Sequence, residues 1–259
     1  ADPQLPGEPG PVQLNIEQIT FTSAPAVTGT ADLPVSMQTA ACSVTATAQA
    51  APTAMVSLAV SAPCHAGEQL TVHHSGMSFT AVLSQSGQYE AMVPALAQTA
   101  VFIAETANGN GAVAVAEVPD INAIERVVLQ WSGNSGFEIH AREFGAAYGS
   151  AGHVWHGANP GAGAGQAVRL GDESLLAPRI AEIYTLLTGQ AGQPGTVSLT
   201  AETEVTAGNC GQDISAQALQ LHDGRLTSRD LVMAMPGCEA LGSFLVLNNL
   251  VEDLKIASN

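Results

Sequence analysis

The sequence predicts an all-β protein made of two β-sandwich domains in tandem, each with a disulfide-closed hairpin. Short segments of strand-forming residues recur at regular spacing between turn signals, and the first half has no helical period. Two cysteine pairs each bracket a strand–turn–strand pattern. We expect a Pro/Gly-rich tail at residues 1–11, a first domain at 12–120 and a second at 121–259.

Cys42 and Cys64 bracket the first of these patterns. The segments 43–49 and 54–61 are rich in strand formers, and Pro52-Thr53 midway between them predicts a turn. If the chain folds back there, the two Cα atoms face each other at about 4.5–5.5 Å, within the range that a disulfide allows. We therefore predict a Cys42–Cys64 disulfide.

Cys210 and Cys238 bracket the second pattern, with Asp223-Gly224 almost midway. Asp-Gly between alternating segments is typical of a hairpin turn, so we predict a Cys210–Cys238 disulfide. Buried free thiols and a zinc site are the alternatives, but zinc pairs usually stand about two to four residues apart. Ala-Gln follows Cys42 and Cys210 at the same offset, which indicates either a duplicated hairpin or chance in an Ala-rich chain.

The first half consists of consecutive short strands. Alternation of Val12, Leu14 and Ile16 with polar residues predicts a strand over 12–21, which pairs either within the subunit or with a neighbour. After a loop to about residue 40, turn signals such as Ser75-Gly76 separate seven further strands. These are expected at 43–49, 54–61, 68–74, 77–83, 88–93, 99–106 and 111–118.

One stretch of this half resembles a known family. Residues 67–96, "GEQLTVHHSGMSFTAVLSQSGQYEAMVPAL", are similar to the carboxypeptidase-regulatory-like or transthyretin-like modules of secreted proteins. The resemblance implies an Ig-like or transthyretin-like sandwich that acts as a spacer or binding domain, and it carries over no active site. The whole chain is also similar to secreted bacterial proteins whose function is uncharacterised.

The second half predicts another sandwich. Residues 126–148 read as strand, turn and strand, with a hairpin turn at 133–136, and the Gly/Ala/Pro run at 157–165 is expected to be irregular. The segment 177–189 fits a strand or a short helix, and we favour the strand. A strand at 195–205 follows, and 243–257 predicts one long final strand or a pair.

Charge restricts the partners. The chain has 23 acidic and 7 basic residues, and its first basic residue is Arg126. Such a surface repels nucleic acid and anionic lipid headgroups, which need clustered cations. No stretch approaches about 18 continuous apolar residues, so no membrane span is predicted. The expected partners are a protein, further copies of the chain or a divalent cation, and no cofactor is expected.

Disulfides predict an oxidising, extracytoplasmic location: the periplasm, the cell surface or the medium. The first eleven residues, "ADPQLPGEPGP", fit either a mature end left after signal removal or residual vector sequence. Both explanations imply secretion.

Three histidines form the candidate metal site. His153 and His156 stand three apart, and His140 lies between Glu138 and Arg142 on one strand face. Imidazole suits Zn, Cu or Ni, so His140, His153 and His156 are the candidate ligands of a composite metal site. Gly152 and Gly157 argue against a helix there, and exposed or singly bonded histidines are the alternative.

Two weaker constellations complete the candidates. Asp120, Asn122 and Glu125 could bind calcium at the linker, although solvated turns explain such clusters more simply. Trp131 and Trp155, the only two tryptophans, could form a sugar-stacking platform or fill the core. "GNSG" at 133–136 is similar to the nucleophile loop of trypsin-like proteases, but Phe137 stands where those enzymes have glycine.

These observations favour a non-enzymatic structural, adhesive or accessory binding subunit of the bacterial cell envelope. A self-assembling surface fibre subunit and a secreted metal-dependent enzyme with a histidine site are the alternatives.

Overall fold

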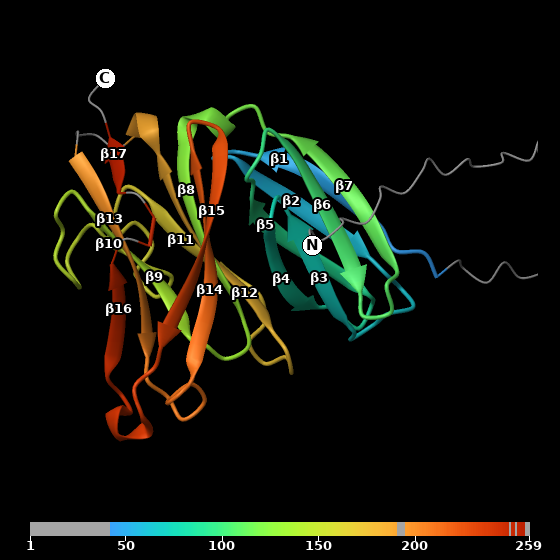
Figure 1. Ribbon diagram of the computed structural model, residues 1–259. Coiled ribbons are helices and arrows are strands. Elements are labelled where there is room, and N and C mark those ends of the chain that lie inside the picture. The colour runs from blue at the N-terminus through green and yellow to red at the C-terminus, as the bar shows by residue number, and fades with distance from the viewer. Residues whose placement is uncertain (1–41, 191–194, 249, 252, 257–259) are drawn as a thin grey trace, which may run out of the picture. The chain divides into compact units, whose positions relative to one another are not determined.

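The computed structural model describes residues 42–190, 195–248, 250–251 and 253–256 (Figure 1). Within these ranges the chain is nearly all β, and its only helical turns are three-residue 3-10 segments. Ala41–Asn259 form one compact unit that contains four sheets. The all-β expectation is confirmed, while the assignment to two tandem Ig-like domains stays a prediction.

The first half builds two antiparallel sheets that pack into a sandwich-like layer pair. One sheet has the strand order β1-β2-β5 and the other β4-β3-β6-β7. All seven strands lie within a residue or two of the expected ranges. Their bounds are Thr45–Ala51 (β1), Met55–Ser61 (β2), Gln69–His74 (β3), Met77–Val82 (β4), Gln88–Pro94 (β5), Thr99–Thr106 (β6) and Gly111–Glu117 (β7).

The second half builds two five-stranded sheets. One has the order β11-β12-β8-β14-β15, and the other has the order β10-β9-β13-β16 with β17 also paired to β13. The strands of the first are Ile124–Ser132 (β8), Gln166–Leu170 (β11), Arg179–Leu187 (β12), Asp213–His222 (β14) and Arg225–Ala234 (β15). Those of the second are Phe137–Glu143 (β9), His153–Val154 (β10), Gly195–Glu204 (β13), Phe244–Asn248 (β16) and Leu254–Ile256 (β17).

Strand β8 is covered on both faces. Along β8, Ile124 and Val128 join the core of the first half, whereas Val127, Leu129 and Trp131 join that of the second. A strand covered on both sides needs apolar residues without alternation, which explains the continuous apolar run in this strand. The first core therefore crosses the boundary expected between residues 120 and 121, and the division into two domains stays a prediction.

Both predicted disulfides are present. Cys42 bonds Cys64 with a Cα–Cα distance of 5.3 Å, and Cys210 bonds Cys238 with one of 5.0 Å. Each closes the expected hairpin: β1 pairs with β2 around residues 52–54, and β14 pairs with β15 around Asp223-Gly224. Asp223 and Gly224 both have positive φ, as the tight turn requires.

The remaining strand expectations have mixed outcomes. Residues 177–189 form strand β12 rather than a helix, 243–257 contain a pair of strands, and 157–165 have no regular structure. The turn at 133–136 is not a hairpin, because both edges of β8 are already paired, with β12 and β14. The chain passes there from one sheet to the other. The strand expected at 12–21 and the tail at 1–11 lie outside the described residues.

The described part of the chain has no helix long and apolar enough to cross a membrane.

Candidate functional site

The candidate site lies on one face of the sheet that contains β9 and β13. Phe137, Ile139 and Ala141 of β9 enter the core, so the alternating residues Glu138, His140 and Arg142 face the other way. The pairing between strands adds neighbours to this face. Glu138 lies opposite Glu202, His140 opposite Thr200, and Arg142 opposite both Ser198 and His153.

His140 and His153 form a directly bonded pair, called the histidine pair below. His140 Nδ1 lies 2.9 Å from His153 Nε2, and both residues are buried. The backbone N–H of Gly149 donates to His153 Nδ1 at 2.9 Å, which makes that nitrogen an acceptor. The proton of neutral His153 must therefore sit on Nε2 and point to His140 Nδ1. His140 in turn carries its proton on Nε2 and donates to Glu138 Oε2 at 3.3 Å.

His153 cannot take up a proton on Nδ1 without losing the hydrogen bond from the Gly149 N–H, because that nitrogen is the acceptor. Burial lowers the pKa of His153, which agrees with this cost of protonation. The hydrogen bond from His140 lowers the pKa of Glu138.

Two more buried carboxylates lie near β9, and one of them, Glu202, contacts the pair. Glu202 accepts hydrogen bonds from Tyr148 and Thr200, and its Oε2 lies 3.8 Å from His140 Nε2. Glu182 accepts from Arg169 and from the backbone N–H of Ile139. These buried carboxylates have donors, as burial requires.

His156 is not bonded to the histidine pair directly, but its Nδ1 lies 4.0 Å from Glu138 Oε1, and the other oxygen of Glu138 accepts from His140. His156 Nδ1 lies 2.7 Å from Glu182 Oε1, although the angle is outside hydrogen-bond geometry. Contact with Glu182 raises the pKa of His156. His156, the third predicted ligand, therefore lies beside the ion pair that Glu182 forms with Arg169.

Aromatic rings stack against the histidine pair. Trp155 lies nearly parallel to His140, with ring centroids 5.2 Å apart, and His140 lies nearly parallel to His153 at 5.1 Å. Tyr148 meets His153 edge-on, and the Arg142 guanidinium lies over the Tyr148 ring at 5.1 Å. The stack fixes Trp155 in one orientation although it sits on a loop.

The loop at 157–165 is irregular but anchored. Glu143 Oε2 accepts from the N–H of Ala164 at 2.7 Å, and Glu143 Oε1 accepts from Gly165 N–H at 2.8 Å and from the Tyr184 hydroxyl at 2.7 Å. A Cβ on Gly163 would lie 2.5 Å from Glu143, and one on Gly165 would lie 2.5 Å from Tyr184. Glycine is required at both positions because the backbone approaches buried side chains closely.

A cavity of about 480 Å³ opens where this loop meets the aromatic stack. We call it the Trp155 cup. His153 and Trp155 form one side, and the rest consists of small residues together with Ser150, Asn159 and Pro160. None of the residues that line the cup is Asp, Glu, Lys or Arg.

Of the predicted metal ligands, the structure joins His140 and His153 and places His156 against Glu182. The three do not form a group with one ligand atom each within 4.8 Å of the others. The metal hypothesis stays a prediction. Two residues that contact the pair, Tyr148 and Glu202, were missed, because only the strand register and the loop path bring them there. Glu182, which contacts His156, was missed for the same reason.

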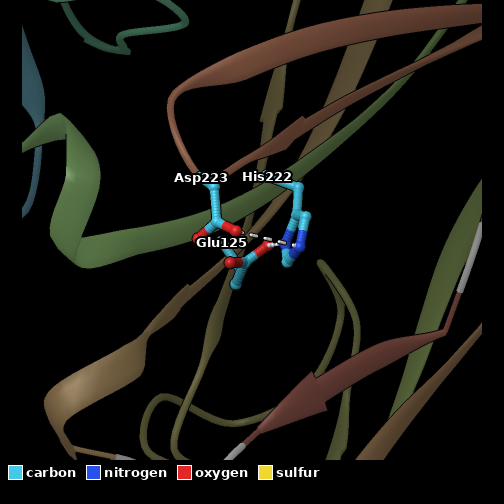
Figure 2. Close-up of side chains that lie close together, drawn as sticks. All are labelled: Glu125, His222 and Asp223. Atoms are coloured by element: carbon cyan, nitrogen blue, oxygen red, sulfur yellow. Dashed lines mark hydrogen bonds and ion pairs between the residues drawn. The ribbon is translucent and has the colours of Figure 1, made fainter.

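The described residues contain one group that meets this distance criterion: Glu125, His222 and Asp223 (Figure 2). His222 Nδ1 lies 2.8 Å from Glu125, and its Nε2 lies 3.4 Å from Asp223. His222 thus lies between the two carboxylates, and these contacts account for the proximity of the three side chains. Of the residues proposed for calcium, Glu125 lies here, whereas Asp120 accepts from the N–H of Ala54.

The tryptophans have separate roles. Trp131 is buried in the second core and meets Phe137 edge-on, so it fills the core. Of the two tryptophans, only Trp155 lines the cup, so the two rings do not form a joint platform for a sugar.

No family model matches the chain, and no curated protein matches it either.

Proposed function

We propose that the protein is a non-enzymatic, extracytoplasmic binding subunit whose Trp155 cup takes a neutral, hydroxyl-rich ligand, a saccharide. One observation carries this proposal: both ring nitrogens of His153, the only ionisable side chain that lines the cup, are already engaged. A general base needs a free nitrogen within reach of its substrate. The cup therefore offers shape, stacking and hydrogen bonds, and no reactive group.

The lining favours a neutral ligand. The net charge of −16 repels anions, and no carboxylate lines the cup to hold a cation. Trp155 gives an apolar ring surface on which the C–H face of a sugar can lie. Ser150 and Asn159 offer donors and acceptors for hydroxyl groups.

An extracytoplasmic location is supported by the two disulfides, which persist in oxidising compartments. An accessory role in the cell envelope agrees with a binding site that carries no catalytic group.

Intrinsic fluorescence tests the proposal, because Trp131 and Trp155 are the only tryptophans. Trp131→Phe keeps an aromatic ring in the core and leaves Trp155 as the sole reporter. Titration with neutral tetrasaccharides, such as cellotetraose, chitotetraose and mannotetraose, should shift its emission and protect it from acrylamide quenching. The Trp155→Phe variant, whose reporter is Trp131, should give no shift. Absence of any shift in the Trp131→Phe protein across the set would overturn the saccharide assignment.

A second candidate function, metal binding, rests on the 2.9 Å between His140 Nδ1 and His153 Nε2. Two nitrogens 2.9 Å apart can share one ion at the usual Zn–N distance of about 2.0–2.1 Å, if the His153 proton moves from Nε2 to Nδ1 and the bond from Gly149 N–H breaks. Equilibrium dialysis against Zn²⁺ and Cu²⁺ tests it. Stoichiometric binding that a His140→Ala His153→Ala variant loses, and a His156→Ala variant keeps, would establish this function in place of the first.

A further inference from the structure

An exposed aliphatic patch lies on the outer face of β6 and β7. Four β-branched side chains make it: Val101, Ile103, Val113 and Val115, with exposed fractions of 40%, 46%, 60% and 53%. They form two directly opposed pairs, Val101 with Val115 and Ile103 with Val113. The alternate residues of both strands face the core, so register fixes these four outward. Contiguous exposed aliphatic residues of this kind mark interaction surfaces.

Carboxylates stand at both ends of the patch. Glu117 lies at one end, opposite Thr99, and Glu105 lies at the other, opposite Gly111. Thr99 and Glu105, which mark the two ends on β6, are six residue steps apart, or about 20 Å at about 3.4 Å per residue. No lysine or arginine precedes Arg126, so the sequence places no cation in this half to neutralise these carboxylates.

We propose that this patch docks a segment of a partner protein that presents aliphatic side chains between basic residues about 20 Å apart. Apolar contact supplies the affinity, and the two carboxylates fix the orientation. A second copy of the chain is a poor occupant, because two bodies with a net charge of −16 repel each other and this face holds no cation to pair with Glu105 or Glu117.

Docking uses the face of the sheet rather than its edge. β7 is the last strand of its sheet, but β1 lies beside it and hinders addition of a further strand there (Figure 1). At the opposite end of the same sheet, β4 packs against β12 of the second half. The β6–β7 end therefore provides the accessible part of this face. The patch is also separate from the Trp155 cup, which belongs to β9, β10 and the loops after them.

Peptide binding tests the proposal. The probe is a fluorescent amphipathic Leu/Lys helix of about 14 residues, which spans about 20 Å. Its control is the same peptide with serine at every leucine. Wild-type protein should bind the probe at least tenfold more tightly than the control in anisotropy titrations.

Isosteric variants locate the contact. Val113→Thr Val115→Thr keeps shape and strand propensity but adds hydroxyls, and it should weaken probe binding about tenfold. Val232→Thr, on an exposed valine of β15, should leave binding unchanged. Glu105→Gln Glu117→Gln should weaken binding at 50 mM salt and have no effect at 1 M salt, where charges are screened.

Two results would overturn the proposal. One is unchanged binding in the Val113→Thr Val115→Thr protein. The other is a wild-type dimer in light scattering that this variant converts to monomer, since the occupant would then be a second copy.

Discussion

Arg126 Nη1 donates a hydrogen bond of 2.9 Å to the backbone carbonyl of Ala54, which lies 72 residues earlier in the chain. The same group donates to the carbonyl of Ala95, and Arg126 Nε donates to Thr185 Oγ1 at 2.8 Å. Arg126 is fully buried, and this burial lowers its pKa to about 9. It therefore stays protonated at neutral pH and connects loops of the first half to the sheet of β8.

Replacing Arg126 with methionine should lower the free energy of unfolding by about 3–5 kcal/mol, because buried carbonyls lose their donor. The free energy of unfolding of Arg126→Lys should lie between those of wild type and Arg126→Met, since an ammonium cannot reach all the acceptors. Urea unfolding at pH 7 measures both. A loss below about 1 kcal/mol in Arg126→Met would show that these bonds contribute little net stability.

His74 should make the protein acid-sensitive. Its Nδ1 donates to the carbonyl of Val101 and its Nε2 accepts the N–H of Leu96, so a second proton would break the Leu96 bond. Burial lowers the pKa of His74 from 6.5 to about 4. The unfolded chain therefore binds the proton first, and stability is lost as the pH falls from 6.5 to 4. The loss from this group is about 3 kcal/mol.

The measurement is the pH dependence of urea unfolding between pH 7 and pH 4. His74→Leu should be less stable at pH 7 but should lose about 3 kcal/mol less over this range than wild type. His73→Asn, on the opposite strand face, is the matched control for removing a histidine from the same strand. Equal slopes in wild type and His74→Leu would contradict the assignment.

Acid should also open the rim of the Trp155 cup. Folding lowers the pKa of His153. The contribution of His153 to stability is therefore complete above pH 6.5 and is lost as the pH falls through the lowered pKa of the folded state. Protonation must break the bond from Gly149 N–H to His153 Nδ1, which holds the rim. In Trp131→Phe protein, we expect the emission of Trp155 to shift with a midpoint below 6.5.

Two variants separate the histidines next to Trp155. Asn at position 153 can still accept from Gly149 but does not titrate, so His153→Asn should abolish the transition below 6.5. The pKa of His156 is raised, so any signal from it lies above 6.5 and should vanish in His156→Gln. A transition below 6.5 that survives His153→Asn would refute the role given to the histidine pair.

Local pattern predicted much of this fold. Alternation and turn residues located the seven strands of the first half, and Asp223-Gly224 located the hairpin that the second disulfide closes. Both signals are short-range, so they can be read without the tertiary structure. The hairpin predicted at 133–136 was wrong, because local sequence does not show whether the strand after a turn joins the same sheet or the facing one.

The candidate site was only partly predictable. Glu138 and His140 share a face by strand period alone, whereas Glu202 joins them through a register between strands about 60 residues apart. Glu143 could not be assigned a role, because its contacts to the loop depend on where that loop packs. Long-range pairing, rather than residue type, decides these contacts.

A substitution at Gly165 tests whether the loop at 157–165 is held in place by Glu143 and Tyr184. A Cβ there would lie 2.5 Å from the Tyr184 hydroxyl and 2.7 Å from its ring. Tyr184 cannot move aside, because it is fully buried and its hydroxyl donates to Glu143. Gly165→Ala should therefore lower the free energy of unfolding by about 1–3 kcal/mol.

The same substitution should also speed hydrogen exchange at the amides of Ala164 and Gly165, which Glu143 holds. Gly189→Ala is the matched control: nothing lies within 4 Å of a Cβ there, so its effect should stay within about 0.5 kcal/mol. If saccharide binding needs the loop in place, Gly165→Ala should weaken it while Gly189→Ala does not. Equal stability and equal exchange in the two variants would mean that the loop adapts, and that Glu143 does not fix the wall of the cup.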